Sequence, residues 1–193
     1  MLDHIRKYDI LLASNSPRRR ELLSGLGIEY QVTALPDIDE SYPKSLQGEE
    51  IPKYIAAAKA AAYKQEMTDK TLLITADTIV WLKGKVFGKP KDKDDAKNML
   101  RALSGNTHTV ITGVCISTPE KQISFAVSTD VSFTVLDEDE IDFYIENYKP
   151  IDKAGAYGIQ EWIGFVGVNK IRGSYFNVMG LPIHRLYQEL KHF

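Results

Sequence analysis

The sequence has little cysteine, no long apolar run and no excess of either charge. Its 193 residues include one cysteine, Cys115, which excludes an internal disulfide and fits a reducing compartment. Nowhere do 18 apolar residues run together, as a membrane-spanning helix would require. Lysine and arginine number 24 against 26 aspartates and glutamates, so the general basic surface of a nucleic-acid-binding domain is missing. We therefore expect a soluble cytoplasmic protein that binds neither nucleic acid nor a membrane.

Histidine is also scarce, and its placement argues against a zinc site. The four histidines are scattered, and no pair has the spacing of metal ligands. Cys115 lies in a β-branched run, which predicts a buried structural thiol and not a nucleophile. A metal in this chain would then be a hard cation, Mg²⁺ or Mn²⁺, held by carboxylate, water and phosphate oxygens.

A candidate phosphate site lies near the N-terminus. The apolar run 10–13 predicts a buried strand, and Ser16 with Pro17 predicts the start of a helix. The first N–H groups of such a helix bind anions. Arg18 and Arg19 add guanidinium groups that can grip phosphate oxygens, although arginines at such a position are commonly solvated. The hydroxyl of Ser14 either donates to the same phosphates or belongs to a plain turn.

The rest of the chain alternates helices and strands without a strict βαβ order. Hydrophobic periodicity and helix-boundary residues predict helices over 17–26 (closed by Gly27), 49–62, 92–103, 137–148 and 181–191. Apolar and β-branched runs predict strands over 10–13, 30–32, 71–76, 79–82, 86–87, 107–118, 121–135, 155–159, 165–171 and 175–178. This mixture predicts an α/β or α+β protein with a mixed sheet.

Four charged residues stand out as candidates for chemistry, each with an ordinary alternative. Asp77 follows the apolar strand 71–76, where it is either a presented carboxylate or a turn residue. Glu40, with Asp39 as its near competitor, closes an acidic loop that is either a metal site or simply exposed. Lys59 and Lys89 are phosphate binders or solvated surface lysines.

Five segments together resemble the Maf family of nucleoside triphosphate pyrophosphatases. They are 12–23, 76–80, 88–90, 152–160 and 173–182, in the family's order and at similar spacing. Several long motifs in order are far more specific than one short motif. The likeness covers almost the whole chain. It implies one catalytic domain over 1–193 with two lobes, in the elongated inosine triphosphatase-like fold with its active site in a central cleft.

The resemblance also implies the reaction and the residues that perform it. It implies a metal-dependent hydrolysis of dTTP and UTP to the nucleoside monophosphate and pyrophosphate, with Asp77 as general base and with Glu40 and Asp77 at the metal. The implied phosphate-binding residues are Ser14, Arg18, Arg19, Lys59 and Lys89. The implied specificity residues are Arg18, Thr78 and Gln160. A glutamine amide both donates and accepts, as the edge of a pyrimidine demands.

Two other readings and an assembly question stay open at this point. The rival function is a non-catalytic nucleotide-binding regulator of cell division, and a nucleic-acid-binding module is a weaker third. A homodimer is plausible from the family. Trp81, Tyr144 or Trp162 would mark the interface if exposed. Trp162 either stacks on a base or, in the ordinary case, packs in the core or at an interface.

Overall fold

The computed structural model describes residues 2–35 and 38–193, which divide into two compact units. Unit 1 comprises Met1–Asp77, Thr112–Val127 and Gly180–Phe193, and unit 2 comprises Thr78–Ile111 and Ser128–Met179. Each unit is described by itself below. The loop residues Pro36 and Asp37 of the predicted acidic stretch lie outside the described residues.

The described strands form one mixed sheet, in the order β2-β1-β3-β5-β6-β7 with β4 paired to β3. Their bounds are β1 Asp9–Ala13, β2 Gln31–Thr33, β3 Thr71–Leu82, β4 Lys85–Phe87, β5 Thr107–Ser117, β6 Gln122–Phe133 and β7 Val168–Arg172. β1 pairs in parallel with β2 and β3, whereas β3 with β4 and β6 with β7 are antiparallel. The predicted mixed α/β class is therefore confirmed.

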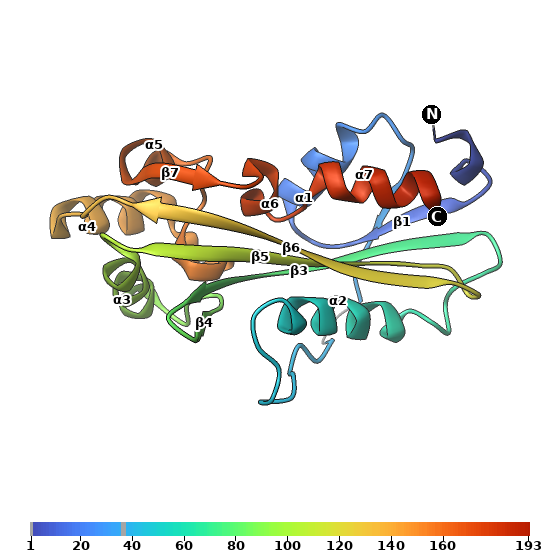
Figure 1. Cartoon of the computed structure of the whole chain (residues 1–193), viewed down its shortest axis with the longest axis horizontal. Coiled ribbons are helices and arrows are strands. Elements are labelled where there is room, and N and C mark those ends of the chain that lie inside the picture. The colour runs from blue at the N-terminus through green and yellow to red at the C-terminus, as the bar shows by residue number, and fades with distance from the viewer. Residues whose placement is uncertain (1, 36–37) are drawn as a thin grey trace. The chain divides into compact units, whose positions relative to one another are not determined.

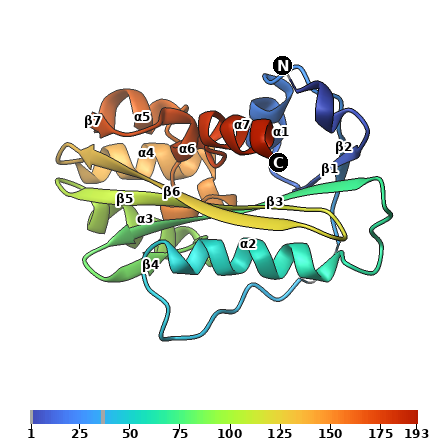
Figure 2. The ribbon, with the colours of Figure 1, turned by 45° about the vertical axis from the view of Figure 1, so that its right-hand side comes forward.

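In unit 1, helices cover both faces of the sheet. They are η1 Asp3–Ile5, α1 Pro17–Ser24, α2 Glu50–Ala62 and α7 Ile183–His192. Figures 1 and 2 show α2 running along β3 on one face, with α1 and α7 on the other. The core under α2 contains Ala56, Ala60, Tyr63, Leu73 and Cys115. Burial also raises the pKa of the Cys115 thiol, which agrees with the predicted structural role.

Small residues let α2 lie very close to the sheet. A Cβ added at Gly113 of β5 would stand 2.2 Å from the backbone carbonyl carbon of Pro52 in the first turn of α2. The helix is thus where the sequence predicts it. Its buried side contains Ile51, Ile55, Ala56 and Ala60, whereas Tyr54, which also fits the apolar helical period, is exposed.

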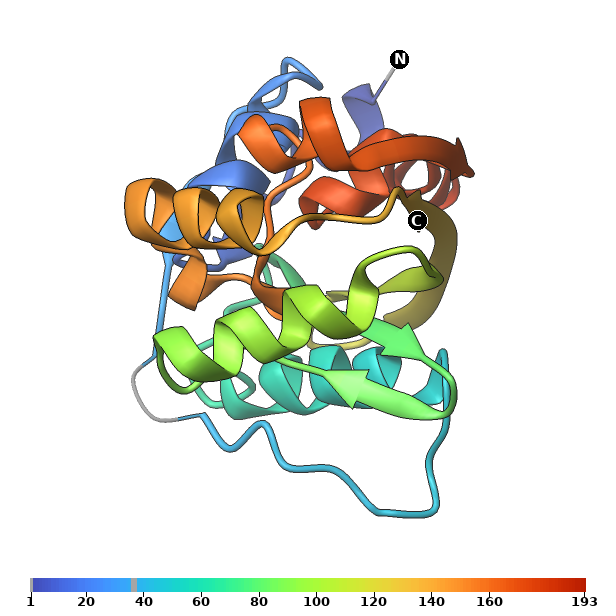
Figure 3. The ribbon, with the colours of Figure 1, turned by 90° about the vertical axis from the view of Figure 1, so that its left-hand side faces the viewer.

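In unit 2 the helices are α3 Lys93–Leu103, α4 Glu138–Tyr148, η2 Pro150–Asp152, η3 Ala154–Ala156, α5 Trp162–Gly167 and α6 Tyr175–Met179. Figure 3 shows α3 beside the β3–β4 hairpin. Three ion pairs join α3 to α4, namely Lys93–Glu146, Lys97–Asp142 and Arg101–Glu138. The residue numbers increase along α3 while those of their partners decrease along α4, so the two helices pack antiparallel.

Several predicted elements need correction. The two strands expected over 71–76 and 79–82 are one strand, β3, so Asp77 lies within a strand and not at its end. The segments 155–159, 165–171 and 175–178 were expected as strands, but only β7 forms, and the others are turns and short helices. Glycine permits this, because Gly155 adopts φ of 69°, outside the strand region. Helix α1 also ends at Ser24 instead of reaching Gly27, which takes φ of 65° beyond it.

Candidate functional site

Lys59 joins the two carboxylates that the sequence predicts for the site. Its Nζ lies 2.9 Å from Asp77 Oδ1 and 2.8 Å from Glu40 Oε1. The side chains of Lys59 and Asp77 are each 13% exposed, whereas that of Glu40 is 49% exposed. An ion pair shielded to this degree is screened by water and salt far less than an exposed one. Three predicted residues therefore meet at one point of unit 1.

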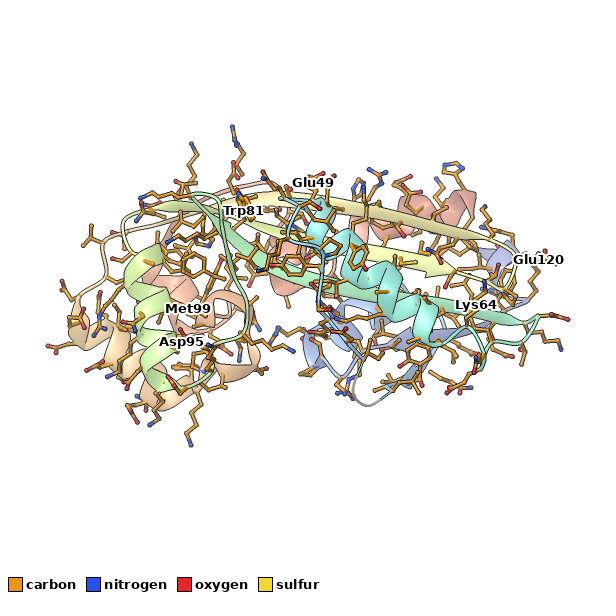
Figure 4. The ribbon with its side chains drawn as sticks, turned by 90° about the horizontal axis from the view of Figure 1, so that it is seen from below. Glu49, Lys64, Trp81, Asp95, Met99 and Glu120 are labelled. Atoms are coloured by element: carbon orange, nitrogen blue, oxygen red, sulfur yellow. The ribbon has the colours of Figure 1, made fainter. Side chains whose placement is uncertain are left out.

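The packing of α2 on β3 places Lys59 there. Thr75 Oγ1 donates to the carbonyl of Ala56 across 2.6 Å in the buried interior. Ala56 is about one helical turn before Lys59, and Thr75 is two residues before Asp77 on the same face of β3. The hydrogen bond between Thr75 and Ala56 therefore aligns α2 with β3 so that Lys59 lies beside Asp77. In Figure 4, Glu49 and Lys64 mark the two ends of the helix that carries Lys59. The local fold thus explains why a lysine and an aspartate far apart in the sequence form an ion pair.

The structure also separates Glu40 from its competitor Asp39. Both oxygens of the Asp39 carboxylate accept hydrogen bonds from Ser41, at 2.8 Å from its N–H and 2.9 Å from its hydroxyl. Those bonds lower the pKa of Asp39 and hold its carboxylate in a local turn. Earlier in the same loop, the Leu35 N–H donates to the Tyr63 hydroxyl at 2.7 Å, which ties the loop to the C-terminal end of α2. Glu40 is therefore the acidic loop residue that reaches Lys59.

Arg19 binds main-chain oxygens beside the charged centre. Its Nη1 donates to the carbonyl of Ala76 at 2.9 Å, and its Nε donates to the carbonyl of Gly180 at 2.8 Å. Burial lowers the pKa of Arg19, and the Asp77 carboxylate partly opposes that effect. Arg19 thus fixes the peptide group directly before Asp77, and its predicted phosphate contact stays a prediction.

The predicted start of α1 is confirmed, and two serine side chains accept hydrogen bonds from backbone N–H groups there. The side chain of Ser16 caps the helix by accepting from the Arg19 N–H at 3.5 Å, and Pro17 is the first helical residue. The buried Ser14 hydroxyl accepts from the Ser16 N–H at 3.2 Å. A hydroxyl that accepts in this way keeps its own proton to donate. Arg18 lies half-buried in the first turn of the same helix.

Unit 2 holds Thr78, Lys89 and Gln160. Thr78 is half-buried on β3, and Lys89 is exposed after β4. The backbone links two of the predicted motifs, because the Gly155 N–H donates to the Gly88 carbonyl at 3.0 Å. A Cβ at Gly155 would stand 2.8 Å from Val80 Cγ2, so this position favours glycine for space as well as for its φ.

Gln160 carries an amide oxygen that is buried without a hydrogen bond. Among residues 2–35 and 38–193, nothing donates to Gln160 Oε1. Such a group costs about 1–3 kcal/mol when no partner is supplied. The Gln160 amide oxygen is thus an acceptor that a ligand or a water molecule can satisfy.

Comparison with known proteins decides the family. The model of the family described as Maf-like protein matches residues 9–193. The chain belongs to the Maf-like family. Over 99% of both chains it is 63% identical to the dTTP/UTP pyrophosphatase of Bacteroides fragilis strain YCH46 and 64% identical to that of Phocaeicola vulgatus.

Solved structures show that the Maf-like chain shares a fold with Ham1 proteins. The Staphylococcus aureus Ham1 protein has a TM-score of 0.58 at 15% identity, covering 95% of this chain and 98% of its own. A Ham1 protein from Coxiella burnetii has a TM-score of 0.53 at 14% identity, covering 96% and 100%. The fold expected from the family resemblance is confirmed. The single catalytic domain and the central cleft stay predictions.

The carboxylate oxygens around Lys59 are suitable ligands for a hard divalent cation that is bound together with phosphate. Glu40 and Asp77 already place carboxylate oxygens around one positive charge, and magnesium sites commonly use one or two carboxylates with substrate oxygens and water. In the described part of the chain, no group of three or more His, Cys, Asp or Glu side chains could hold a metal.

Sequence reasoning missed some residues of this region and misjudged others. Lys153 lies within the predicted motif 152–160 and Glu161 directly follows it, yet no local signal marks the two as partners, because their contact depends on the turn between them. Tyr144, which would mark an interface only if exposed, is fully buried. Trp162 packs its ring on Phe143 at 4.8 Å between centroids. No helix in the described ranges is long and apolar enough to cross a membrane.

Proposed function

We propose that this chain is a nucleoside triphosphate pyrophosphatase that converts dTTP and UTP to the monophosphate and pyrophosphate. The observation that carries the activity is identity above 60% to dTTP/UTP pyrophosphatases along almost the full length of both chains. The geometry adds what such chemistry needs, a carboxylate held beside a cation. A regulator that only binds nucleotides has no need of that carboxylate.

Asp77 is proposed as the general base. A water oxygen attacks the α-phosphorus, its proton passes to the Asp77 carboxylate, and the bond from the α-phosphorus to the bridging oxygen breaks to release pyrophosphate. Lys59 holds Asp77 Oδ1, and Arg19 holds the preceding carbonyl, so the carboxylate enters the reaction already oriented. The other carboxylate oxygen of Asp77 is the atom that takes the proton in this proposal.

The remaining predicted residues are assigned by charge and hydrogen-bonding capacity. Ser14, Arg18, Arg19, Lys59 and Lys89 are proposed to bind the phosphates. Glu40 and Asp77 would hold a Mg²⁺ or Mn²⁺ ion, which supplies charge neutralisation at the phosphate oxygens. Arg18, Thr78 and Gln160 are proposed to select the base. A cytoplasmic location and a homodimer remain part of the proposal.

The test is pyrophosphate release from dTTP, UTP, CTP, dATP, GTP, 7-methyl-GTP and dITP, with Mg²⁺, with Mn²⁺ and with EDTA. We expect metal-dependent release with dTTP and UTP preferred. Asp77→Asn should lower kcat on the order of 100-fold or more, as loss of a general base does. The matched control is Asp69→Asn, at an exposed position just before β3. Tight nucleotide binding without release by the wild type would favour the regulator, and full activity in Asp77→Asn would remove Asp77 from its role.

A further inference from the structure

A hydrogen-bonded network in unit 2 adjoins Gln160, and none of its members was assigned a role above. The Tyr144 hydroxyl, on α4, donates to Glu161 Oε2. The same hydroxyl accepts from the Gly158 N–H at 2.9 Å. Lys153 Nζ lies 3.3 Å from the other carboxylate oxygen, Glu161 Oε1. One oxygen of Glu161 therefore accepts a hydrogen bond from a phenol, and the other forms an ion pair with an ammonium, which also donates to Asp152 Oδ1 at 2.8 Å.

This network is buried, unlike most charge pairs of the unit. Tyr144 is fully buried, and the side chains of Lys153 and Glu161 are 9% and 20% exposed. The Lys93–Glu146 pair of the same unit is more than half exposed at both ends. Charge-assisted hydrogen bonds shielded from water are stronger and more rigid than exposed ones. The Tyr144–Glu161–Lys153 network therefore keeps these three side chains, and the backbone they contact, in a fixed arrangement.

The geometry that it holds is the turn containing Gln160. The Glu161 N–H donates to the Gly158 carbonyl at 3.0 Å, which closes the turn around Ile159 and Gln160. A Cβ at Gly158 would stand 2.9 Å from the carboxyl carbon of Glu161, so the carboxylate lies directly against the backbone of the turn. A Cβ at Gly164 would stand 1.8 Å from the carbonyl oxygen of Ile159. The backbone on both sides of Gln160 is therefore closely packed.

The orientation of the Gln160 amide matters for base choice. Uracil and thymine present an N3–H donor beside an O4 acceptor, whereas cytosine presents an N3 acceptor beside an N4 donor. A glutamine amide matches the first pattern in one orientation and the second when it is flipped by 180°. The amide oxygen of Gln160 is buried and accepts no hydrogen bond from the described residues, so it is ready to accept one from N3–H.

We propose that Tyr144, Glu161 and Lys153 are positioning residues that hold the turn carrying Gln160 and so set the choice of uracil and thymine over cytosine. The proposal rests on the proposed function, because it assumes that Gln160 meets the base. UTP and CTP differ only at the edge in question, so their comparison isolates the amide from every phosphate and metal contact.

The variants are Tyr144→Phe and Glu161→Gln, each with a matched control. Tyr148→Phe removes the hydroxyl of a tyrosine on the same helix whose ring stacks on Tyr144 at 5.1 Å. Glu146→Gln neutralises the exposed glutamate paired with Lys93. The measurements are kcat and KM for UTP and CTP, with Kd for each nucleotide by calorimetry. We expect the UTP-to-CTP ratio of kcat/KM to fall on the order of 10-fold in Tyr144→Phe, through KM and with kcat within about twofold.

Glu161→Gln should lose less selectivity than Glu161→Ala, because the amide oxygen still accepts from Tyr144 whereas alanine cannot. Both controls should keep the wild-type ratio. An unchanged ratio in the folded variants overturns the proposal, and so does an equal loss for UTP and CTP, which would indicate a purely structural role. If Tyr144→Phe does not fold, the comparison of Glu161→Ala with Glu161→Gln decides, since glutamine preserves the shape of the side chain.

The two proposals fail in different arms of this experiment. A wild type that releases no pyrophosphate from any nucleotide overturns the proposed function. The Kd ratio for UTP and CTP, compared between wild type and variants, then still tests the positioning of Gln160. A wild type that hydrolyses UTP while the variants keep its selectivity overturns the positioning proposal only.

Discussion

The two units hold their candidate residues by opposite means. In unit 1, side chains from distant parts of the chain meet through charge, with Lys59 bridging Asp77 and Glu40. In unit 2, Gln160 sits in a tight turn whose glycines leave no room for a side chain. In the proposed function the first arrangement exchanges an ion pair for a metal or a phosphate, whereas the second keeps its shape. The difference suits charge neutralisation in one unit and recognition of a base in the other.

Two glycines, one in each unit, give the largest test of this contrast. Gly113→Ala puts a methyl group 2.2 Å from the Pro52 backbone, and Gly164→Ala puts one 1.8 Å from the Ile159 carbonyl oxygen. Neither neighbour is a flexible side chain, so each change should destabilise the fold by about 3 kcal/mol. For a chain of this size that is a fall in Tm of roughly 6–12 °C, measured by thermal unfolding.

The two variants should have different effects on catalysis and on selectivity. Gly113→Ala displaces the helix of Lys59 and should lower kcat for every nucleotide alike. Gly164→Ala displaces the turn of Gln160 and should lower the UTP-to-CTP ratio. Each variant is the control for the other, and the same functional change in both would erase the contrast between the units.

Replacing the bridging lysine tests the charged centre directly. Lys59→Met keeps the length of the side chain but leaves two carboxylates without their cation. We expect kcat/KM to fall on the order of 100-fold, or about 2.7 kcal/mol of transition-state stabilisation. The control is Lys64→Met, at the exposed end of the same helix (Figure 4). An unaffected Lys59→Met enzyme would show that the ion pairs are scaffolding alone.

Local signals in the sequence predicted those parts of the molecule that depend on local physics. Ser16 with Pro17 marks a helix start through capping, which needs only neighbouring residues, and this cap is observed. Glu40 and Asp77 came from the family resemblance, and their meeting at Lys59 could not be seen from spacing. That contact depends on how α2 docks on the sheet.

The errors have physical causes in tertiary context. Strand β3 continues through Asp77 although aspartate is unfavourable in strands. The Asp77 carboxylate forms an ion pair with Lys59, and the carbonyl of the preceding residue accepts a hydrogen bond from Arg19. The β-rich composition after Gly155 suggested strands, but Gly155 takes φ of 69°, and Gly158 and Gly164 allow close backbone approaches, so turns and short helices form instead. Glu161 escaped notice because its partners Tyr144 and Lys153 come from outside the turn.

A buried neutral histidine gives unit 2 a different response to acid. His108 Nε2 lies 2.7 Å from the Tyr157 hydroxyl, among the rings of Phe133 and Tyr157. Burial lowers the pKa of His108 from 6.5 to about 4, with Asp130 opposing the shift. Above pH 6.5 the group is neutral in both states. As the pH falls towards 4 the unfolded chain takes up a proton that the folded chain does not, so stability declines.

The expected loss from this histidine is about 2 kcal/mol between pH 6.5 and pH 5. Chemical denaturation of His108→Gln across that range should show a decline smaller by this amount. His184→Gln, at an exposed position of α7, serves as the control. Identical pH profiles for the wild type and His108→Gln would mean that His108 already titrates normally in the fold.

The smallest test concerns how α2 is registered on β3. Thr75→Val keeps the shape of the side chain and removes the hydrogen bond to the Ala56 carbonyl, which should cost about 1 kcal/mol and roughly 2–4 °C in Tm. Thr107→Val removes an exposed hydroxyl contact of unit 2 and should change little. If kcat also falls about twofold in Thr75→Val, the hydroxyl helps aim Lys59 at Asp77. If stability falls while kcat holds, the close approach at Gly113 aligns the helix on its own, and the charged centre owes its geometry to packing.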